Sequence, residues 1–448
     1  MNEAPFPTQA AVSRSFPPPP ARPPLLPRFS RLRASLAACT GEGLAAEAVS
    51  ACFGNAVVTA WGIELGASPV VLGALWGLPY FGQVFQLPGA WVTARFGAKR
   101  TSVVANAIAR QVLLPLAALP FVDVGAAAKR AMLIALFALS SLLATVGNNA
   151  WLAWMGELVP ARVRGRYFAR RAALCTVAAT VASFAIASAL DAGRAHRALG
   201  FVLAASVLAR SAFGVAATAL MSRQHESPQA VPSPQLGELR LPFAHPVYRE
   251  LLVYRAAWGL ATGLAASVSA VYLIEGLGLG FLGVAGYGAL VAALRVATAS
   301  LWGRTLDRAG PGRVLVACSF GAAGASALWI GGIGGRPWLI ALDAVLSGVL
   351  LGGQELAAFT LPLSGAPPAK RHLFIAWSMA IGGVAYGLAC AAGGALASCT
   401  STRAVVVASV GARLLAATTA LRIPDGDTAP LRASPARAVQ RLGDESPG

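Results

Sequence analysis

The side chains best placed for chemistry in this sequence are polar groups that stand alone inside long apolar runs. A charged or amide group in such a run is costly unless it faces water, a partner or a ligand. The groups of this kind are Glu47, Asn55, Asn148, Asn149, Arg295, Asp343, Gln354 and Glu355. They indicate a polar site or path inside an otherwise apolar protein.

The residue patterns that metal proteins and ATP-driven enzymes need are missing from the sequence. The four histidines are scattered and form no H-E-x-x-H pair, and no lysine follows a G-x-x-x-x-G segment. The six cysteines lie mostly inside apolar runs without paired spacing, as small buried residues do. We therefore expect no cofactor and no metal site, and we do not expect an enzyme.

The composition is that of an integral membrane protein. The chain has 448 residues, of which 56% are hydrophobic and 12% are charged, and its mean hydropathy is +0.64. Soluble domains carry about 25% charged residues. The net charge of +18 could suggest nucleic acid, but the basic residues are spread over short loops, so we expect no nucleic-acid partner.

About twelve apolar runs follow one another, each about 20 residues long, as a membrane-spanning helix requires. They lie near 41–65, 69–93, 101–121, 131–156, 169–190, 198–221, 250–274, 280–303, 314–333, 337–361, 373–396 and 403–421. The expected fold is therefore all-α, with the helices in two bundles.

The sequence divides into five predicted segments. The ends and the middle are polar and rich in proline, so they are not expected to form a core. The segments are a disordered basic tail (1–40), a first six-helix bundle (41–221), a linker (222–249), a second six-helix bundle (250–421) and a disordered tail (422–448).

The basic residues predict the orientation, because loops on the cytoplasmic side carry more lysine and arginine. One set of alternate loops holds Arg95, Lys99, Arg100, Arg162, Arg164, Arg166, Arg170, Arg171, Arg223, Arg240, Arg249, Arg304, Arg308, Arg313, Lys370 and Arg371. The other set holds only Lys129, Arg130, Arg194, Arg197, Arg336 and Arg403. We expect the first set and both termini to be cytoplasmic.

The two halves resemble one another. The sixth run contains Ala-Ser-Val-Leu-Ala-Arg ending at Arg210, and the twelfth contains Ala-Ser-Val-Gly-Ala-Arg ending at Arg413. The first run ends in Trp-Gly-Ile-Glu at Glu64, and the seventh in Tyr-Leu-Ile-Glu at Glu275. An even number of spans separates the copies, so the repeat is parallel, with its axis along the membrane normal.

The segment from Gly303 to Arg313 resembles the short cytoplasmic signature of the major facilitator superfamily, G-x-x-x-D-R-x-G followed by basic residues. In mechanical terms, Gly303 permits close helix approach and Gly310 supplies a positive φ at a tight turn. Asp307 is expected to cap a helix N-terminus. Arg308 and Arg313 are expected to stay in the cytosol.

The counterpart in the first half is degenerate. It keeps Arg95, Gly97 and Arg100, but Ala94 stands at the acidic position and the glycine comes one residue early. If the mechanism of the superfamily applies, closure of the cytoplasmic side depends on Asp307 more than usual.

The segment from Glu157 to Arg171 resembles the loop between the fourth and fifth spans in a bacterial branch of the superfamily. Pro160 is expected to end the helix and Gly165 to make the turn. The arginines, among them Arg164 and Arg166, can then meet Glu157 or lipid phosphates. Structural anchoring and a direct part in gating both remain open.

The resemblance also implies a central cavity, lined mainly by the first, fourth, seventh and tenth spans. The isolated polar residues named at the outset lie on these spans, apart from Arg295 on the eighth. Glu47, Asp343 and Glu355 are the acidic candidates for a proton relay, and the sequence does not choose among them. Glu47 could instead neutralise Arg255, which has a similar depth.

Three arginines lie deep in spans that are usually peripheral: Arg110, Arg210 and Arg413. Their repetition at equivalent positions favours an architectural role, with the guanidinium bonded to carbonyls of a neighbouring helix. A role in ligand binding would instead indicate an anionic substrate.

The sequence as a whole predicts a secondary transporter of a small solute that works by alternating access and is coupled to an ion, most simply a proton. We expect a monomer in contact with membrane lipids. Two alternatives remain. One is a lipid flippase or polytopic membrane enzyme, and the other is a non-transporting sensor or assembly partner, which the missing acid at Ala94 favours.

Overall fold

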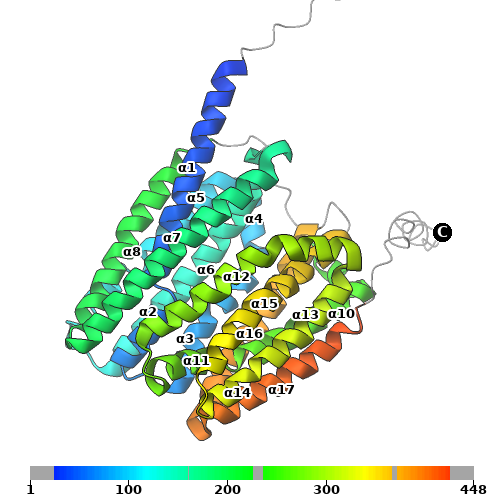
Figure 1. Ribbon diagram of the computed structural model, residues 1–448. Coiled ribbons are helices and arrows are strands. Elements are labelled where there is room, and N and C mark those ends of the chain that lie inside the picture. The colour runs from blue at the N-terminus through cyan, green and yellow to red at the C-terminus, as the bar shows by residue number, and fades with distance from the viewer. Residues whose placement is uncertain (1–24, 160, 226–235, 366–370, 424–448) are drawn as a thin grey trace, which may run out of the picture.

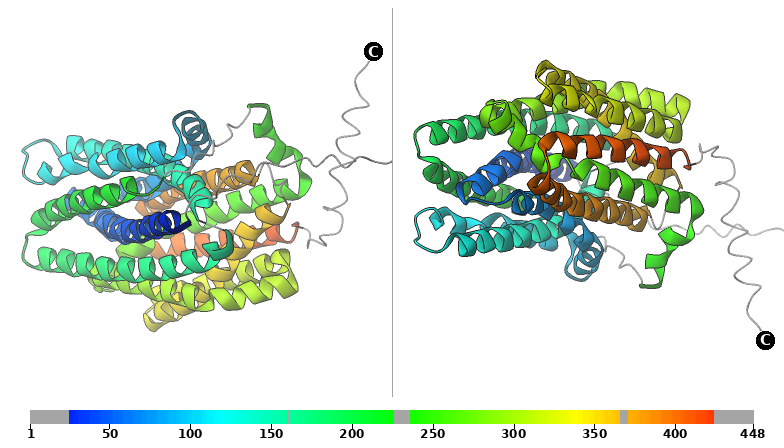
Figure 2. Two further views of the ribbon diagram at one scale, coloured as in Figure 1. Left: turned by 90° about the horizontal axis from the view of Figure 1, so that it is seen from above. Right: turned by 90° about the horizontal axis from the view of Figure 1, so that it is seen from below.

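The computed structural model describes residues 25–159, 161–225, 236–365 and 371–423, and these residues form helices and short connections without a strand. Twelve helical segments are long and apolar enough to cross a membrane. Figures 1 and 2 show them as two bundles packed side by side. The all-α fold with two bundles is thus confirmed, while the exact domain limits stay predictions.

The first bundle contains six spans, and its first three are interrupted. Its elements are α1 (Leu25–Ala51), α2 (Asn55–Glu64), α3 (Pro69–Phe81), η1 (Gly82–Phe85), α4 (Gln86–Phe96), α5 (Ala98–Gln111), η2 (Leu114–Ala118), α6 (Ala126–Leu158), α7 (Ala161–Ala195) and α8 (Leu199–Ser222).

The second bundle repeats this plan after a connection of two short helices. Its elements are η3 (Leu236–Arg240), α9 (Leu241–Ala244), α10 (Pro246–Gly263), α11 (Ala266–Val271), η4 (Tyr272–Gly276), α12 (Gly280–Ala309), α13 (Pro311–Ser326), α14 (Leu328–Ile333), α15 (Trp338–Gly365), α16 (Arg371–Cys399) and α17 (Thr402–Ala420).

The first helix starts earlier than the sequence analysis predicted. Residues 25–40 were assigned to a disordered tail, but they belong to α1. Pro27 falls in the first turn, where proline is tolerated. Farther along, Cys39 is fully buried against Trp154 and Met221, so packing stabilises the added turns. Residues 1–24 and 424–448 of the two predicted tails lie outside the described residues.

The two ends of the bundles need names. We call the end that carries the turns at Gly97 and Gly310 the motif side, and the opposite end, with the turns at Gly66 and Gly278, the far side. Gly97 and Gly310 have the same φ of 86° and similar ψ values of 148° and 152°. This left-handed conformation favours glycine, so the two copies of the repeat share one turn geometry.

Helices α3 and α16 join the bundles through glycine contacts. A Cβ built on Gly73 would lie 2.1 Å from the carbonyl oxygen of Cys390, and one built on Gly77 would lie 2.7 Å from that of Gly387. Small residues let helix backbones approach this closely in membranes. Contact between the same spans continues toward the motif side, where Leu87 of α4 packs near Leu373.

Helices α7 and α12 join the bundles on the far side. The carboxylate of Asp191 accepts hydrogen bonds from the backbone nitrogens of Phe281 (2.8 Å) and Leu282 (2.9 Å) at the N-terminus of α12. Nearby, Arg194 and Glu275 form an exposed ion pair of 3.7 Å. An apolar cluster that contains residues of both bundles lies beneath these polar contacts. The far side is therefore closed.

The glycine contacts predict the effect of a single methyl group. Gly73→Ala should destabilise the protein by about 1–3 kcal/mol, because the added Cβ collides with backbone that has no room to shift. Thermal unfolding in detergent measures this loss. The control is Gly324→Ala, whose Cβ would meet nothing within 4 Å and which should leave the melting temperature unchanged or raise it. Equal melting temperatures for the two variants would contradict the contact.

The Asp191 contact predicts how firmly the far side is closed. Asp191→Asn removes the charge at the α12 N-terminus, at a cost of about 1 kcal/mol or roughly fivefold in the closed population. The measurement is labelling of a cysteine at Ser183, in the cavity between the bundles, by an impermeant maleimide added from the far side. Cavity-lining Cys175 and exposed Cys399 are first replaced by serine.

In that background, Asp191→Asn should raise the labelling rate severalfold. Asp123→Asn is the matched control, because Asp123 is an exposed far-side carboxylate outside the α7–α12 contact. The proposed closure would be wrong if both variants were labelled at the rate of the parent protein.

Candidate functional site

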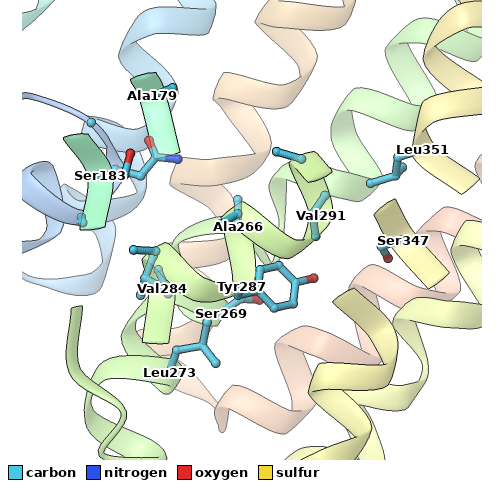
Figure 3. A pocket seen from close by; sticks show the side chains of 18 of the residues that line it. Ala179, Ser183, Ala266, Ser269, Leu273, Val284, Tyr287, Val291, Ser347 and Leu351 are labelled. Carbon is cyan, nitrogen blue, oxygen red and sulfur yellow. The ribbon is translucent and has the colours of Figure 1, made fainter. Parts of the chain in front are cut away.

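A cavity of about 920 Å³ lies between the two bundles. Its walls come from α1, α2, α3 and α7 of the first bundle and from the helices α10 to α17 of the second. Much of the wall consists of alanine, serine and threonine, as the view in Figure 3 shows around Ala179, Ser183, Ala266 and Ser269. Small side chains at these positions leave the space open.

Four aromatic side chains also line the cavity. Trp76 comes from the first bundle, and Tyr287, Trp329 and Tyr386 come from the second. The indole nitrogen of Trp76 donates to the hydroxyl of Thr59 at 3.1 Å, so its ring has a fixed orientation. Apolar surface with a few fixed polar groups is typical of small-molecule sites.

Asp343 is the most firmly held acid of the cavity. Its side chain is 1% exposed and accepts hydrogen bonds from the Tyr287 hydroxyl (2.6 Å), the Trp329 indole nitrogen (2.8 Å) and the Ser347 hydroxyl (2.9 Å). In Figure 3, the hydroxyl of Tyr287 points toward Ser347. Both carboxylate oxygens are engaged, so Asp343 links α12, α14 and α15.

Arg413 also lines the cavity. Its buried Nε has no hydrogen-bond partner among the described residues, so this N–H group is free to donate to a ligand. The equivalent Arg210 is used differently: it donates to the carbonyl of Val49 (2.8 Å) and to the hydroxyl of Ser140 (3.3 Å). The bond from Arg210 to the Val49 carbonyl of a neighbouring helix is of the kind expected for an architectural role.

The first bundle holds an ion cluster that the sequence analysis missed. Glu42 is 3% exposed and pairs with Arg110 at 2.8 Å and with Arg171 at 3.3 Å. The cluster ties α1 to α5 and α7, and it gives Arg110 a carboxylate partner instead of the expected carbonyls. Glu42 was overlooked because the first helix was predicted to start at residue 41, which placed this acid at the membrane boundary.

Glu47 and Asn55 both line the cavity between the bundles. The carboxylate of Glu47 has no ion pair or hydrogen bond with any described residue. The pairing of Glu47 with Arg255, considered from their similar depth, does not occur, because Arg255 faces a second cavity. Depth along a helix was predictable, but the direction of each side chain around the helix was not.

The second cavity, of about 530 Å³, lies within the second bundle on the motif side of the first. Arg255, Arg295 and Glu355 line it, and Arg295 pairs with Glu355 at 2.9 Å. The predicted candidates Arg295 and Glu355 are thus together, but apart from Glu47, Asn55 and Asp343.

Three further candidates line neither cavity, and two of them contact neighbouring helices. The amide of Asn149 donates to the carbonyl of Gln86 at 2.9 Å, which ties α6 to the second span. Gln354 is 2% exposed and donates to the Tyr254 hydroxyl at 2.7 Å. Asn148, which precedes Asn149 in the sequence, is exposed. An amide at membrane depth can satisfy a backbone carbonyl as well as a ligand, and sequence alone does not separate these uses.

The signature segment forms the motif-side end of α12 and the following turn. Asp307 is exposed, and no described residue forms an ion pair or hydrogen bond with it, so the expected cap is not made here. A Cβ on Gly303 would meet nothing within 4 Å. In the first half, the guanidinium of Arg95 lies 5.8 Å from the ring of Phe96. The gating role of the segment stays a prediction.

The loop between the fourth and fifth spans is shorter than predicted. Helix α6 ends at Leu158 and α7 begins at Ala161, so Gly165 lies inside α7 and does not make the turn. The turn comes before Gly165, because Val159 has an extended conformation that ends α6. Pro160 and the side chains of Glu157, Arg164 and Arg166 lie outside the described residues.

Comparison with known proteins agrees with this architecture. The family model described as Major Facilitator Superfamily matches residues 43–389. No curated protein sequence matches this chain significantly.

Solved structures of transporters superpose on nearly the whole fold. A point mutant of the nucleoside transporter NupG gives a TM-score of 0.69 at 12% identity, over 87% of this chain and 99% of that chain. A D-xylose-proton symporter gives 0.68 at 14%, over 89% and 99%. A bacterial homologue of the iron transporter ferroportin in the inward-facing state gives 0.64 at 14%, over 88% and 98%.

Identities this low establish the fold alone. The family match is different in kind, because it covers well over half of the chain. Together with twelve spans in two bundles around a central cavity, it shows that this chain is a membrane transporter, not an enzyme, and that it belongs to the Major Facilitator Superfamily.

Proposed function

We propose that the protein is a secondary active transporter that moves a small solute by alternating access through the cavity between its bundles. The observation that carries this proposal is the cavity itself, which both bundles line and which the Asp191 contact closes on the far side. A site that lies between two repeats and is closed at one end fits a bundle-rocking mechanism. Similar structures are named for the transport of a nucleoside and of xylose with a proton.

We further propose that the motif side is cytoplasmic, so that the structure has its far side closed toward the outside of a bacterial inner membrane. The support is the excess of arginine in the motif-side loops. The helix ends at Leu25 and Ala420 are both on the motif side, so both chain termini would be cytoplasmic.

The orientation predicts opposite labelling at two exposed positions. A cysteine at Ser222 lies on the motif side and one at Ala126 on the far side. In intact cells, an impermeant maleimide should label the Ala126 site and leave the Ser222 site free until the cells are opened. Labelling of the Ser222 site in intact cells would reverse the orientation.

Proton coupling is assigned here to Glu47. The other acids near the cavities are occupied: Glu42 by two arginines, Glu355 by Arg295, and Asp343 by three donors. Glu47 alone among these carboxylates faces the cavity between the bundles without such a partner among the described residues. A carboxylate in this position can exchange a proton with whichever side the cavity faces.

The transport proposal is tested with the purified protein in liposomes that carry a pH gradient. A uniformly ¹³C-labelled metabolite extract is supplied outside, and mass spectrometry identifies any solute that accumulates above the level in protein-free liposomes. We expect at least one solute to accumulate, and its accumulation to collapse when the gradient is dissipated. A chain that retains no solute but binds a partner protein would support the sensor alternative instead.

The coupling proposal predicts a split between exchange and accumulation. Glu47→Gln should abolish accumulation driven by the pH gradient, because the side chain no longer takes up a proton, while exchange of labelled for unlabelled solute continues. Glu64→Gln is the matched control, since Glu64 is an exposed acid on the same span outside the cavity. Gradient-driven accumulation that persists in Glu47→Gln would remove Glu47 from the coupling step.

A further inference from the structure

Arg255 is a cation inside the second bundle that lacks a carboxylate partner. It lies on α10 and lines the second cavity. Among the described residues, the acceptor for its guanidinium is the Sδ of Met379, a weak acceptor 3.6 Å from Nη2, and its buried Nε has none. A guanidinium in the lipid interior is stable only where water, an acid or a ligand meets it.

The other charges around this cavity do not neutralise Arg255. The charged residues that line it are Arg255, Arg295 and Glu355. Glu355 is bound by Arg295 at 2.9 Å, and the side chains of this pair are 52% and 39% exposed. The buried Nε of Arg295 also has no partner. Two arginines and one carboxylate leave one positive charge, which matches a single monoanionic group.

The size and lining of the cavity indicate that its ligand also has an apolar part. Its volume is about 530 Å³, and the residues beside the charges include Leu356, Phe359 and Ile375. Arginine binds planar carboxylates and phosphates through paired hydrogen bonds. The lining therefore suits a molecule with an anionic head and a short apolar body.

The second cavity continues from the first along shared helices. On α12, Ala292 lines the first cavity and Arg295 the second, less than one turn apart. On α15, Leu351 lines the first and Gly352 the second. A molecule that leaves the cavity between the bundles toward the motif side would meet Arg255 and Arg295 next.

We propose that the second cavity is an anion-binding station, in which Arg255 and Arg295 hold the carboxylate or phosphate of an amphipathic organic anion. The anion is the transported solute if the proposed function holds, and a lipid headgroup is the other source with the same chemistry. The site itself rests on the arrangement of charges and stands without the transport step.

Binding of pentanoate to the full chain in nonionic detergent tests the site, with calorimetry as the measurement. Pentanol and pentylamine are the neutral and cationic controls. Pentanoate should bind at least about tenfold more tightly than either control, because charge-assisted hydrogen bonds to arginine are strong. Equal binding of pentanoate and pentanol would overturn the proposal.

Two variants should change the affinity in opposite directions, which a folding defect would not produce. Arg255→Gln should weaken pentanoate binding about tenfold. Glu355→Gln should strengthen it, because the acid that engages Arg295 is removed. Arg304→Gln, an exposed arginine near the motif-side end of α12, is the control and should have no effect. Unchanged affinity in both cavity variants would also overturn the site.

The source of the anion is separated in nanodiscs of phosphatidylcholine with and without phosphatidylglycerol. If phosphatidylglycerol competes with pentanoate, the occupant is a lipid headgroup. If phosphatidylglycerol does not compete, the occupant is a solute. Both results support the anion site. Intact pentanoate binding in a protein that moves no solute would refute the transport proposal alone, and solute transport by a protein that binds pentanoate and pentanol equally would refute the station alone.

Discussion

Neutralisation of charge inside the membrane is the constraint on which the rest of this structure depends. Buried guanidinium and carboxylate groups must meet a partner, water or a ligand. In the first bundle, Glu42 meets this requirement for Arg110 and Arg171 and thereby joins α1, α5 and α7. Because α1 and α7 form the wall of the cavity on this side, the ion cluster fixes the surface that the second bundle faces.

The internal repeat places equivalent residues in both bundles but uses them differently. The repeat pairs Arg210 with Arg413. Arg210 is fixed to a backbone carbonyl and to Ser140, whereas Arg413 lines the cavity and Asp343 is held by three neighbours. Arg110 and Arg210 bond to residues of the first bundle, whereas Arg255 and Arg413 of the second bundle line cavities.

The sequence was sufficient for the fold because twelve long apolar runs and a parallel repeat are visible without coordinates. It was insufficient for the site, because the depth of a residue can be counted along a helix but its direction around the helix depends on packing. Asn149 and Gln354 have the expected depth, yet their amides bind neighbouring helices. Glu42 was missed for another reason: one misplaced helix start moved a buried acid to the boundary.

The two junctions between the bundles differ in the free energy needed to separate their helices. Helices α3 and α16 touch backbone to backbone at Gly73 and Gly77, and contact between these spans extends toward the motif side. Separating them would open voids along most of the membrane. Helices α7 and α12 are linked by polar contacts of Asp191 and Arg194 at the far side, where water can replace each lost bond. Rocking about the α3–α16 junction therefore costs less than sliding along it, as the proposed alternation between two states requires.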